Sequence, residues 1–414
     1  MSLTPSQEKA WKLLFDTPYN TFLTGGPGTG KSFLIRRFFN ESPVAVDILA
    51  STGAAAIVIG GRTFHSFFGL GIMQGTLQMI LEKAVSNTRV KRRIKKAECI
   101  VIDEISMIPA DALDAAEQVA RAVRKVNVPW GGLRVIGVGD FAQLPPVSRN
   151  APRKWCFDST AWRRSDFQTA VLEDQVRTKD KSFLEVLNKI RIGILDEDVR
   201  AFLDGRVMTE EEVEDGVPRL FPRREQTDKY NLMCLNRLTS DAMSFPTEYL
   251  GEEPYLTQIK KDAPIPEVLE LKKGAIVMFR MNDPKQRFVN GTVGRVEDFD
   301  EGMLAVEVNG ETIEVTTFGF SLHNAEGDEV AHAMNFPVNL AYASTIHKIQ
   351  GATMDRAHID LRSLWEPGQA YVALSRVRTQ KGLSLAGWTP TSIFADPAVS
   401  SFYSALQAAA FEAS

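Results

Sequence analysis

Short apolar runs alternate with amphipathic stretches through the first 150 residues of the chain. The runs are nearly continuous in Val, Ile and Leu, and they lie at residues 21–25, 45–51, 98–104 and 133–140. This composition is typical of a parallel strand that is covered on both faces. Between the runs, the spacing of apolar residues predicts helices over 33–40 and 112–126. The alternation of strands and helices predicts an α/β sheet.

The pattern changes in three later segments. Residues 72–96 are polar and end in the basic run RVKRRIKK, whereas residues 166–240 are mostly helical in pattern. Residues 272–335 contain short apolar runs broken by Gly, Asn and Asp, which predicts a small all-β unit, a compact barrel. The α/β pattern returns after this segment. We therefore expect the β unit to be inserted into a second α/β domain.

The composition is that of a soluble globular protein. The chain has 414 residues, of which 44% are hydrophobic and 24% charged, and at ~150 residues per domain this length predicts roughly three domains. No apolar run reaches the ~18 residues of a membrane helix, and no targeting segment is visible at the N-terminus. We therefore expect a cytoplasmic protein, of bacterial or phage type, with no membrane partner. The three cysteines lie far apart without metal-ligand spacing, which favours reduced thiols over a disulfide or a zinc site.

The segment GGPGTGKS at residues 25–32 matches the phosphate-binding pattern GxxxxGK[ST]. It lies between a predicted strand and a predicted helix, which is the context of a P-loop. Glycines let backbone N–H groups converge on phosphate oxygens, and the following helix directs its positive end at them. Lys31 is positioned to reach the β- and γ-phosphates of ATP, and Ser32 to hold Mg²⁺. The loop residues expected to bind the nucleotide are Gly26, Gly28, Thr29, Gly30, Lys31 and Ser32.

Two further strand ends carry polar groups that suit nucleotide hydrolysis. Asp103 and Glu104 end the run IVIDE; Asp103 fits a magnesium ligand, and Glu104 fits a base that orients the attacking water. Gln143, in GDFAQLPP after the next strand, is placed to bond the γ-phosphate or that water. The alternative interpretations are a solvated acidic turn and a proline-terminated loop. The upstream P-loop favours the catalytic interpretation.

Three other segments carry side chains suited to a nucleic-acid track. STGAAA (51–56) ends a strand with small residues, TFHSF places His65 among aromatics, and STIHKIQG (344–351) groups a hydroxyl, an imidazole and an ammonium. Hydroxyls bind phosphates, and flat rings stack on bases. Taken singly, His65 and His347 are more simply interpreted as structural histidines. The net charge of −4 does not indicate a globally basic binder, but it permits a local positive patch.

Basic side chains outside the P-loop have two interpretations each. Arg177, and Arg376 in YVALSR, are candidate arginine fingers, which contribute ~10³–10⁵ in rate by stabilising charge on the transferring phosphoryl group. The alternative for each is a surface or interdomain salt bridge. The basic run at 89–96 is either a solvated helix face or a phosphate-binding surface close to the point of strand separation.

In order along the chain, these motifs resemble those of superfamily 1B helicases, and more closely those of the petite-integration-frequency (Pif-type) DNA helicases. The motifs are GGPGTGKS, STGAAA with GRTFHSFFGLG, IVIDEISMI, VGDFAQLPPV, STIHKIQGATMD and GQAYVALSRVR. The stretch ALDAAEQVARAVRKVNVPWGGLRVIGVGD is similar to that family's signature segment, and LNKIRIG and DPAVSSFY also fit. The resemblance covers about residues 3–405. Around Arg177 the chain departs from the family, because Val176 and Thr178 stand where an aromatic residue and Gln are usual.

The resemblance implies an α/β fold with two RecA-like P-loop motor domains, a small insertion in the first and a small all-β barrel in the second. The expected boundaries are 1–71 and 97–165 for motor domain 1A, 72–96 for insertion 1B, 166–271 and 336–414 for motor domain 2A, and 272–335 for barrel 2B. We expect ATP- and Mg²⁺-dependent 5′→3′ movement on single-stranded DNA, unwinding of tailed or forked duplexes, and action as a monomer. The alternatives are a RecD-like or Dda-type helicase and, in another class, a P-loop ATPase switch or kinase that does not act on DNA.

The residue roles implied by the resemblance follow the matched motifs. Gln7, in LTPSQEKA, matches the adenine-reading glutamine. The residues that match ATPase positions are Lys31, Ser32, Asp103, Glu104, Gln143, Arg177 and Arg376, with Ser32 and Asp103 expected on Mg²⁺ and Gln350 and Gly351 on the nucleotide. The residues that match the DNA path are Thr52, His65, Thr345, His347 and Lys348.

Overall fold

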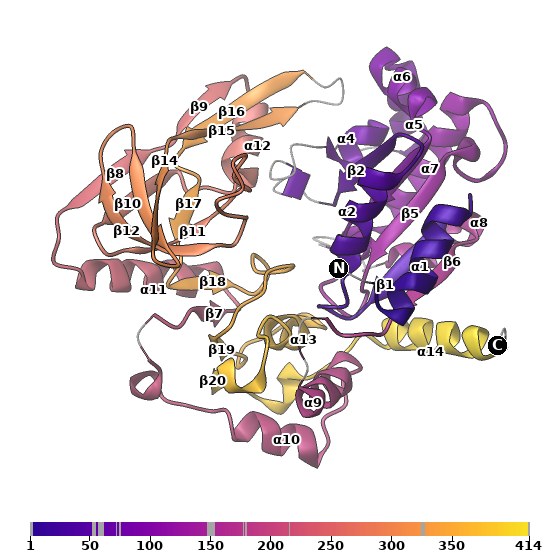
Figure 1. Cartoon of the computed structure of the whole chain (residues 1–414). Coiled ribbons are helices and arrows are strands. Elements are labelled where there is room, and N and C mark those ends of the chain that lie inside the picture. The colour runs from indigo at the N-terminus through magenta and orange to yellow at the C-terminus, as the bar shows by residue number, and fades with distance from the viewer. Residues whose placement is uncertain are drawn as a thin grey trace.

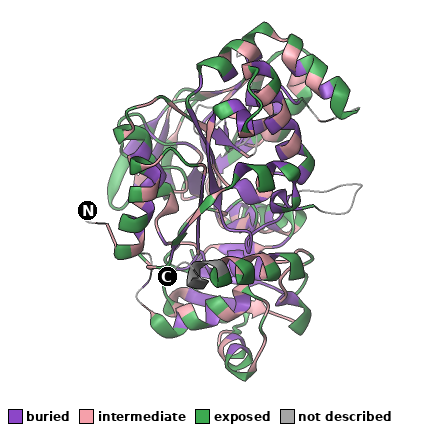
Figure 2. Cartoon of the chain, turned by 90° about the vertical axis from the view of Figure 1, so that its right-hand side faces the viewer, coloured by how far each residue is buried: buried purple, intermediate pink, exposed green. Residues whose placement is uncertain are grey.

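Two parallel sheets and an antiparallel β unit form the body of the protein in the computed structural model (Figure 1). The structure describes residues 3–51, 55–56, 62–71, 73, 76–146, 154–176, 178, 180–214, 216–323 and 328–412. Strands lie inside, and the outer faces of the surrounding helices are exposed (Figure 2). The α/β fold class predicted from the alternating pattern is confirmed.

The first sheet is parallel throughout, with strand order β3-β2-β4-β5-β1-β6. Its strands are β1 (Thr21–Gly25), β2 (Val46–Ala50), β3 (Arg62–Thr63), β4 (Cys99–Ile102), β5 (Arg134–Gly139) and β6 (Gln168–Leu172). The four apolar runs form β1, β2, β4 and β5, as predicted. β6 lies in a segment expected to be helical and to belong to the second motor domain, but it pairs with β1 in the register Thr21↔Gln168. The first α/β body therefore extends beyond residue 165.

Helices pack on both faces of the first sheet. They are α1 (Pro5–Asp16) and α2 (Lys31–Glu41) on one face, and α4 (Phe64–Phe68), α7 (Ala110–Arg124) and α8 (Thr160–Ser165) on the other. The predicted helices over 33–40 and 112–126 correspond to α2 and α7. α1 begins with a capping box in which Thr4 and Gln7 each accept the backbone N–H of the other.

Residues within 72–96 form a helical pair on the outer side of the first body, α5 (Leu77–Ser86) and α6 (Thr88–Lys96) (Figure 1). The Asn87 side chain caps α6, and Val90 and Ile94 are buried on its inner face. The outer face carries most of the basic run. Arg93 is an exception, because its Nη2 atom donates to the carbonyl oxygens of Ser66 and Phe67, both at 2.8 Å.

The second sheet is also parallel, with strand order β18-β7-β19-β20. Its strands are β7 (Arg219–Phe221), β18 (Ala343–Thr345), β19 (Ala357–Asp360) and β20 (Leu383–Gly387). The helices of this body are α9 (Lys181–Arg191), α10 (Glu197–Asp204), α11 (Arg224–Arg237) and α13 (Gln369–Leu374). Residues 166–240 are thus helical only in part. The sequence pattern did not predict the two strands in this segment, β6 and β7.

The β unit lies between α11 and β18 and consists of three antiparallel sheets around one core. The sheets have the orders β14-β13-β12-β11-β17, β15-β16-β9 and β10-β8. Their elements are β8 (Ala242–Pro246), β9 (Glu248–Gly251), α12 (Tyr255–Asp262), β10 (Val268–Lys272), β11 (Ile276–Phe279), β12 (Val293–Phe299), β13 (Leu304–Val308), β14 (Glu311–Val315), β15 (Phe318–His323), β16 (Glu329–Asn335) and β17 (Val338–Leu340). The β unit extends beyond the expected range of residues 272–335. Phe245 and Ile259 precede this range, and they share one hydrophobic core with Val306, which lies inside it.

The last helix, α14 (Pro397–Glu412), returns from the second body and packs against the first (Figure 1). The Phe402 ring lies 4.5 Å from Phe157 and 5.2 Å from Phe141, measured between ring centroids. Although the resemblance assigned this helix to the second motor domain, its aromatic contacts are with the first. It therefore ties the two bodies together.

The remaining elements are short. 3₁₀ helices lie at Ile105–Met107, Pro129–Gly132, Cys156–Asp158, Glu210–Glu212, Gln380–Gly382 and Pro390–Ser392. Of the helices in the described part of the chain, none has the length and apolar character needed to span a bilayer.

Candidate functional site

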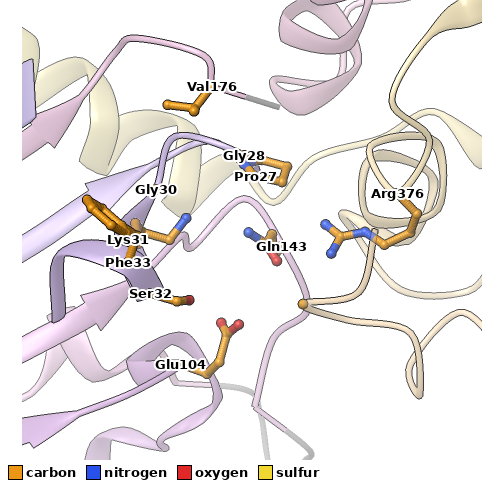
Figure 3. A pocket seen from close by; sticks show the side chains of 11 residues that line it. Pro27, Gly28, Gly30, Lys31, Ser32, Phe33, Glu104, Gln143, Val176 and Arg376 are labelled. Atoms are coloured by element: carbon orange, nitrogen blue, oxygen red, sulfur yellow. The ribbon is translucent and has the colours of Figure 1, made fainter. Parts of the chain in front are cut away.

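A cavity of about 350 Å³ opens between the two α/β bodies. It is lined by Pro27, Gly28, Gly30, Lys31, Ser32, Phe33, Glu104, Gln143, Val176, Gly351 and Arg376 (Figure 3). Gly351 and Arg376 come from the second body, and the other residues come from loops and elements of the first. Loops at the carboxyl ends of the strands form the first body's side, which is where open α/β sheets bind ligands. The cavity thus brings together most of the residues predicted to bind or hydrolyse a nucleotide.

The loop between β1 and α2 is built to receive an anion. Gly28 and Gly30 have φ angles of +85° and +92°, which side-chain-bearing residues rarely adopt. α2 starts at Lys31, and no side chain caps its first N–H groups. Uncapped N–H groups at a helix N-terminus bind phosphate oxygens. The geometry is that of the P-loop predicted from the sequence.

The Lys31 ammonium lies across this loop. Its Nζ atom donates to the carbonyl oxygens of Gly25 at 2.7 Å and Gly26 at 3.2 Å. Burial lowers the pKa of Lys31, although the carboxyl groups of Asp140 and Glu104 act in the opposite direction. A charged phosphate chain would offer this ammonium stronger partners than the two carbonyl groups.

Two acidic residues lie at the end of β4. Burial raises the pKa of Glu104 to about 7, and the neighbouring Asp103 adds to the rise, while Lys31 and Arg376 oppose it. Burial also raises the pKa of Asp103, whose Oδ1 atom accepts the backbone N–H of Glu104 at 3.0 Å. The protein therefore leaves part of this negative charge uncompensated. With the Ser32 hydroxyl beside Glu104 in the cavity, the oxygen donors suit Mg²⁺ (Figure 3).

Gln143 lies in the cavity wall between the two bodies (Figure 3). Its side chain is almost fully buried, and the second body touches its backbone. A Cβ atom on Gly368, which precedes α13, would lie 2.5 Å from the carbonyl oxygens of both Ala142 and Gln143. Only a glycine permits this approach, so the loop containing Gln143 and the start of α13 are in direct contact.

Arg376 faces Lys31 across the cavity (Figure 3). The guanidinium is held by its own body: Nε donates to the Val372 carbonyl at 2.8 Å and Nη2 to the Ser375 hydroxyl at 2.9 Å. Gln350 makes a second connection across the cavity, because its Nε2 atom donates to Glu104 Oε2 at 3.3 Å. Both residues place groups of the second body beside the predicted catalytic machinery.

Gln7 lies behind the P-loop and outside the cavity lining. Its Nε2 atom donates to the Thr29 carbonyl at 2.9 Å, and its Oε1 atom accepts the N–H of Thr4 at 3.1 Å. A Cβ atom on Gly30 would lie 2.4 Å from Gln7 Nε2. In this arrangement the glutamine amide braces the loop.

The sequence did not predict a buried ionic cluster close to the cavity, near Lys31. Asp140 follows β5, and its Oδ1 atom accepts from Arg191 Nη2 of α9 and from the Tyr403 hydroxyl of α14, each at 2.9 Å. Burial alone would raise the pKa of Asp140, but Arg191 and Lys31 hold it below its ordinary value. The runs LNKIRIG and DPAVSSFY contain Arg191 and Tyr403, but no spacing along the chain indicates that they meet Asp140.

Two predicted site residues, Thr52 and Arg177, lie outside the described residues. The residue before Arg177 is placed, however. Val176 lines the cavity, and its N–H donates to the Gly28 carbonyl at 3.0 Å. The segment that leads to Arg177 therefore runs over the P-loop.

The residues predicted for the DNA path lie in two separate places. His65 belongs to α4 of the first body, and burial lowers its pKa. Thr345 is the last residue of β18 in the second body, and His347 and Lys348 follow it. Thr345 is buried, whereas His347 and Lys348 are exposed. The Thr345 Oγ1 atom accepts the Lys348 N–H at 3.3 Å, which closes the turn. Thr345 therefore shapes this loop, and its two neighbours face outward.

Comparison with known sequences identifies relatives along the whole chain. The family model described as PIF1-like helicase matches residues 2–212. ATP-dependent DNA helicase Pif1 of Bdellovibrio bacteriovorus is 48% identical over 405 residues, which cover 97% of this chain and 92% of that protein. ATP-dependent DNA helicase PIF1 of Homo sapiens is 35% identical over 395 residues, which cover 93% of this chain and 61% of that protein. The chain thus spans nearly all of the bacterial relative but less than two thirds of the human one.

Solved structures agree with this result. Pif1 helicase from Candida albicans has a TM-score of 0.84 at 31% identity, and the match covers 98% of this chain and 100% of that one. Bacteroides sp Pif1 in complex with ADP-AlF4 has a TM-score of 0.84 at 28% identity (99% and 98% covered). Bacteroides Pif1 bound to single-stranded DNA has a TM-score of 0.73 at 27% identity (99% and 98% covered). A structure of two coordinating Pif1 helicases at forked duplex DNA has a TM-score of 0.72 at 27% identity, with the same coverage.

Proposed function

The chain belongs to the PIF1-like helicase family, and from this premise we propose that it hydrolyses ATP to move 5′→3′ along single-stranded DNA and to separate the strands of tailed or forked duplexes. The observation that carries the proposal is the composition of the cavity, which takes its P-loop from one body and Gly351 and Arg376 from the other. A nucleotide bound there contacts both bodies, so hydrolysis alters how they are held together. A P-loop switch or kinase has no need of a second body at the phosphates.

We assign the phosphate chemistry to four residues of the first body. The uncapped start of α2 and the Lys31 ammonium bind the phosphates, and Ser32 and Asp103 hold Mg²⁺. The metal supplies charge that neutralises the phosphate oxygens. Glu104 accepts a proton from the attacking water and orients it, which requires the carboxylate form. The cations Lys31 and Arg376 favour that form.

The cavity wall supplies the remaining roles. Arg376, already held by its own backbone, stabilises negative charge on the transferring phosphoryl group, and Arg177 is a second candidate for this role. Gln143 contacts the γ-phosphate or the water, and Gly351 with Gln350 completes the nucleotide site from the second body. Gln7 reads the adenine once its amide leaves the Thr29 carbonyl.

We place the DNA across the carboxyl edges of both sheets. The residues proposed to contact it are Thr52, His65, Thr345, His347 and Lys348. The outward orientation of His347 and Lys348 supports this path on the second body. The β unit, which holds no P-loop, guides the strand, and a single chain is the proposed motor unit.

Displacement of streptavidin from biotinylated oligonucleotides tests the direction of movement. A chain that moves 5′→3′ removes streptavidin from a 3′-biotin and leaves a 5′-biotin in place, in an ATP-dependent reaction. Faster release from the 5′ end would overturn the assigned direction. ATP hydrolysis without release from either end would overturn the translocation itself. Release rates that rise with protein concentration after every strand carries one chain would overturn the single-chain unit.

A further inference from the structure

One carboxyl group organises the loop that carries Gln143. Asp140 follows β5 directly, and its side chain is completely buried. Its Oδ1 atom accepts the Ala142 N–H at 3.1 Å, and its backbone carbonyl oxygen accepts the Gln143 N–H at 3.0 Å. The place of Gln143 in the cavity wall (Figure 3) is therefore set through Asp140, three residues before it.

Tyr403 of α14 holds the same loop from a distant part of the chain. Its hydroxyl donates to Asp140 Oδ1 at 2.9 Å and accepts the Phe141 N–H at 3.0 Å. The Thr24 hydroxyl on β1, just before the P-loop, lies 3.0 Å from the same oxygen. Because the tyrosine proton is committed to Asp140, Thr24 is the donor in this third bond. One phenolic oxygen thus joins the Gln143 loop to the strand that leads into the P-loop.

Arg191 of α9 adds the second motor body to this arrangement. Its Nη2 atom donates to Asp140 Oδ1 at 2.9 Å, and its guanidinium carbon lies 4.4 Å from the centre of the Tyr403 ring. The guanidinium is thus attracted by a carboxylate and by an aromatic face at once. The first body, the second body and the last helix meet at a single carboxyl group. We refer to Asp140, Arg191 and Tyr403 as the Asp140 clamp.

The ion pair of the Asp140 clamp has a second hydrogen bond still to make. Asp140 Oδ2 and Arg191 Nε are both buried, and neither has a hydrogen-bond partner in the part of the chain that the structure describes. These are the two atoms that a bidentate arginine–carboxylate pair would join, beside the bond from Nη2 to Oδ1. A small shift of α9 relative to β5 would complete that pair. Because unpaired buried polar atoms cost free energy, closer approach of the two bodies is favoured at this contact.

We propose that the Asp140 clamp positions Gln143 for ATP hydrolysis, and that its second ion-pair bond forms as the two motor bodies close on the nucleotide. The assignment deepens the proposed function and rests on it. Neither Arg191 nor Tyr403 lines the cavity, so both act through Asp140 as positioning residues. By this route α14 takes part in the ATPase reaction, in addition to tying the two bodies together.

Steady-state ATPase kinetics at saturating oligodeoxythymidine test the positioning role. Tyr403→Phe removes the hydroxyl and keeps the ring beside Arg191. Its kcat should fall by ~10-fold, the effect of one hydrogen bond to a charged group, while the KM for ATP changes by less than ~2-fold. Thermal unfolding confirms that the variant is folded. A lower Tm without any loss of kcat would show a purely structural tyrosine and would overturn the positioning role.

Tyr230→Phe is the matched control for this substitution. The Tyr230 hydroxyl donates to the Glu210 carboxylate at 2.7 Å, and neither residue lines the cavity. The control therefore loses the same kind of hydrogen bond at a different place in the second body. It should keep the wild-type kcat. An equal loss of kcat in both variants would show that the effect in Tyr403→Phe is not specific to the clamp.

A double-mutant cycle tests whether the clamp acts through Gln143. Once Gln143→Ala is present, Tyr403→Phe should cause no further loss of kcat, because the residue that it positions is already gone. Fully additive losses would show that Tyr403 acts by another route and would overturn the assignment.

Arg191→Lys tests the second bond of the ion pair. Lysine keeps the positive charge but lacks the planar fork that a bidentate pair requires. Its kcat should therefore fall by ~10-fold, as in Tyr403→Phe. Arg37→Lys, which alters an ion pair with Glu41 on α2, is the control and should keep the wild-type kcat. Wild-type kcat in Arg191→Lys would overturn the second bond, whereas a wild-type chain that hydrolyses no ATP would overturn the proposed function as well, so the two failures are distinguishable.

Discussion

Lys31 and Glu104 are the two charged side chains whose substitution should separate ATP binding from ATP hydrolysis. Lys31→Ala removes the ammonium that compensates the phosphates, so we expect weaker ATP binding and a loss of turnover of at least ~10²-fold. Glu104→Gln removes only the proton acceptor, so binding of ATP should persist while hydrolysis stops. Equilibrium binding of a fluorescent ATP analogue and steady-state phosphate release measure the two effects. Wild-type hydrolysis by Glu104→Gln would refute the assignment of the base.

Arg376 should affect the rate of hydrolysis and hardly affect ATP affinity. Its guanidinium acts on charge that develops in the transition state, so Arg376→Ala should lower DNA-stimulated kcat by ~10³-fold or more. Arg378→Ala, which truncates an exposed arginine two residues along the chain, is the control. The measurement is ATPase kinetics at saturating oligonucleotide. Normal kcat combined with weakened DNA binding would show that Arg376 has a different role.

The roles of single residues were predictable where the residues of one site are consecutive in the sequence. The P-loop occupies eight consecutive positions, so its pattern and its context could be read together. The cluster of Asp140, Arg191 and Tyr403 joins three segments that are far apart in the chain, and no periodicity indicates that they meet. Gln7 illustrates a further limit, since its motif is evident but its hydrogen bond to the Thr29 carbonyl is set by packing.

At the scale of elements, β19 carries a histidine that should make the second sheet sensitive to acid. Burial lowers the pKa of His358, and its Nδ1 atom lies 2.9 Å from the Ser384 hydroxyl of β20. Below the ordinary histidine pKa of ~6.5 the unfolded chain binds a proton that the folded chain resists. Stability should therefore fall as pH drops through this value. The charged groups that face the ring are Arg219, Glu210, Asp360 and Arg362.

Thermal unfolding between pH 7.5 and 5.5 measures this contribution. His358→Gln removes the titrating ring, so its Tm should decline less over this range than that of the wild type. His323→Gln alters an exposed histidine at the end of β15 and should retain the wild-type decline. An equal decline in His358→Gln and wild type would show that the buried ring does not contribute.

The basic helix α6 should bind phosphates without base preference. Arg92, Lys95 and Lys96 are exposed, whereas Arg93 braces α4 and is left intact. Replacing the three exposed residues by Gln should reduce unwinding of tailed duplexes and flatten the salt slope of DNA binding by up to ~2, at ~0.7 per contact. The double variant Lys9→Gln/Lys12→Gln on α1 is the control. An unchanged salt slope together with normal unwinding would show that α6 is only a solvated helix face.

Elements were predictable where both faces are buried. β1 and β4 are buried at every position, and β4 is apolar throughout. In β6 exposed and buried positions alternate, and β8 is mostly exposed, so neither resembles the apolar runs of the first body. Their place is set by partners far along the chain, β1 for β6 and β10 for β8. The expected boundary at 165 therefore separates β6 from the first sheet, with which it pairs. The expected boundary at 272 separates β8 and β10 from the β unit, whose core they share.

The whole molecule is organised around contacts that cross between the two motor bodies. Gly368 meets the backbone of Gln143, Gln350 bonds Glu104, and Arg191 pairs with Asp140, all close to the nucleotide cavity. Removing one partner of a buried ion pair lowers the free energy of unfolding by about 3–5 kcal/mol. Contacts of this kind therefore stabilise the arrangement of the two bodies. The order of the motifs predicted two motor bodies, but the C-terminal return of α14 to the first body could only be seen in the structure.

Unwinding of two duplexes that differ only in the polarity of their single-stranded tail tests the central claim most directly. With ATP and Mg²⁺, the wild type should separate the duplex with a 5′ tail and leave the duplex with a 3′ tail at background. Lys31→Ala should separate neither. Preferential unwinding of the 3′-tailed duplex, or unwinding that proceeds equally without ATP, would contradict a 5′→3′ motor driven by the cavity between the two bodies.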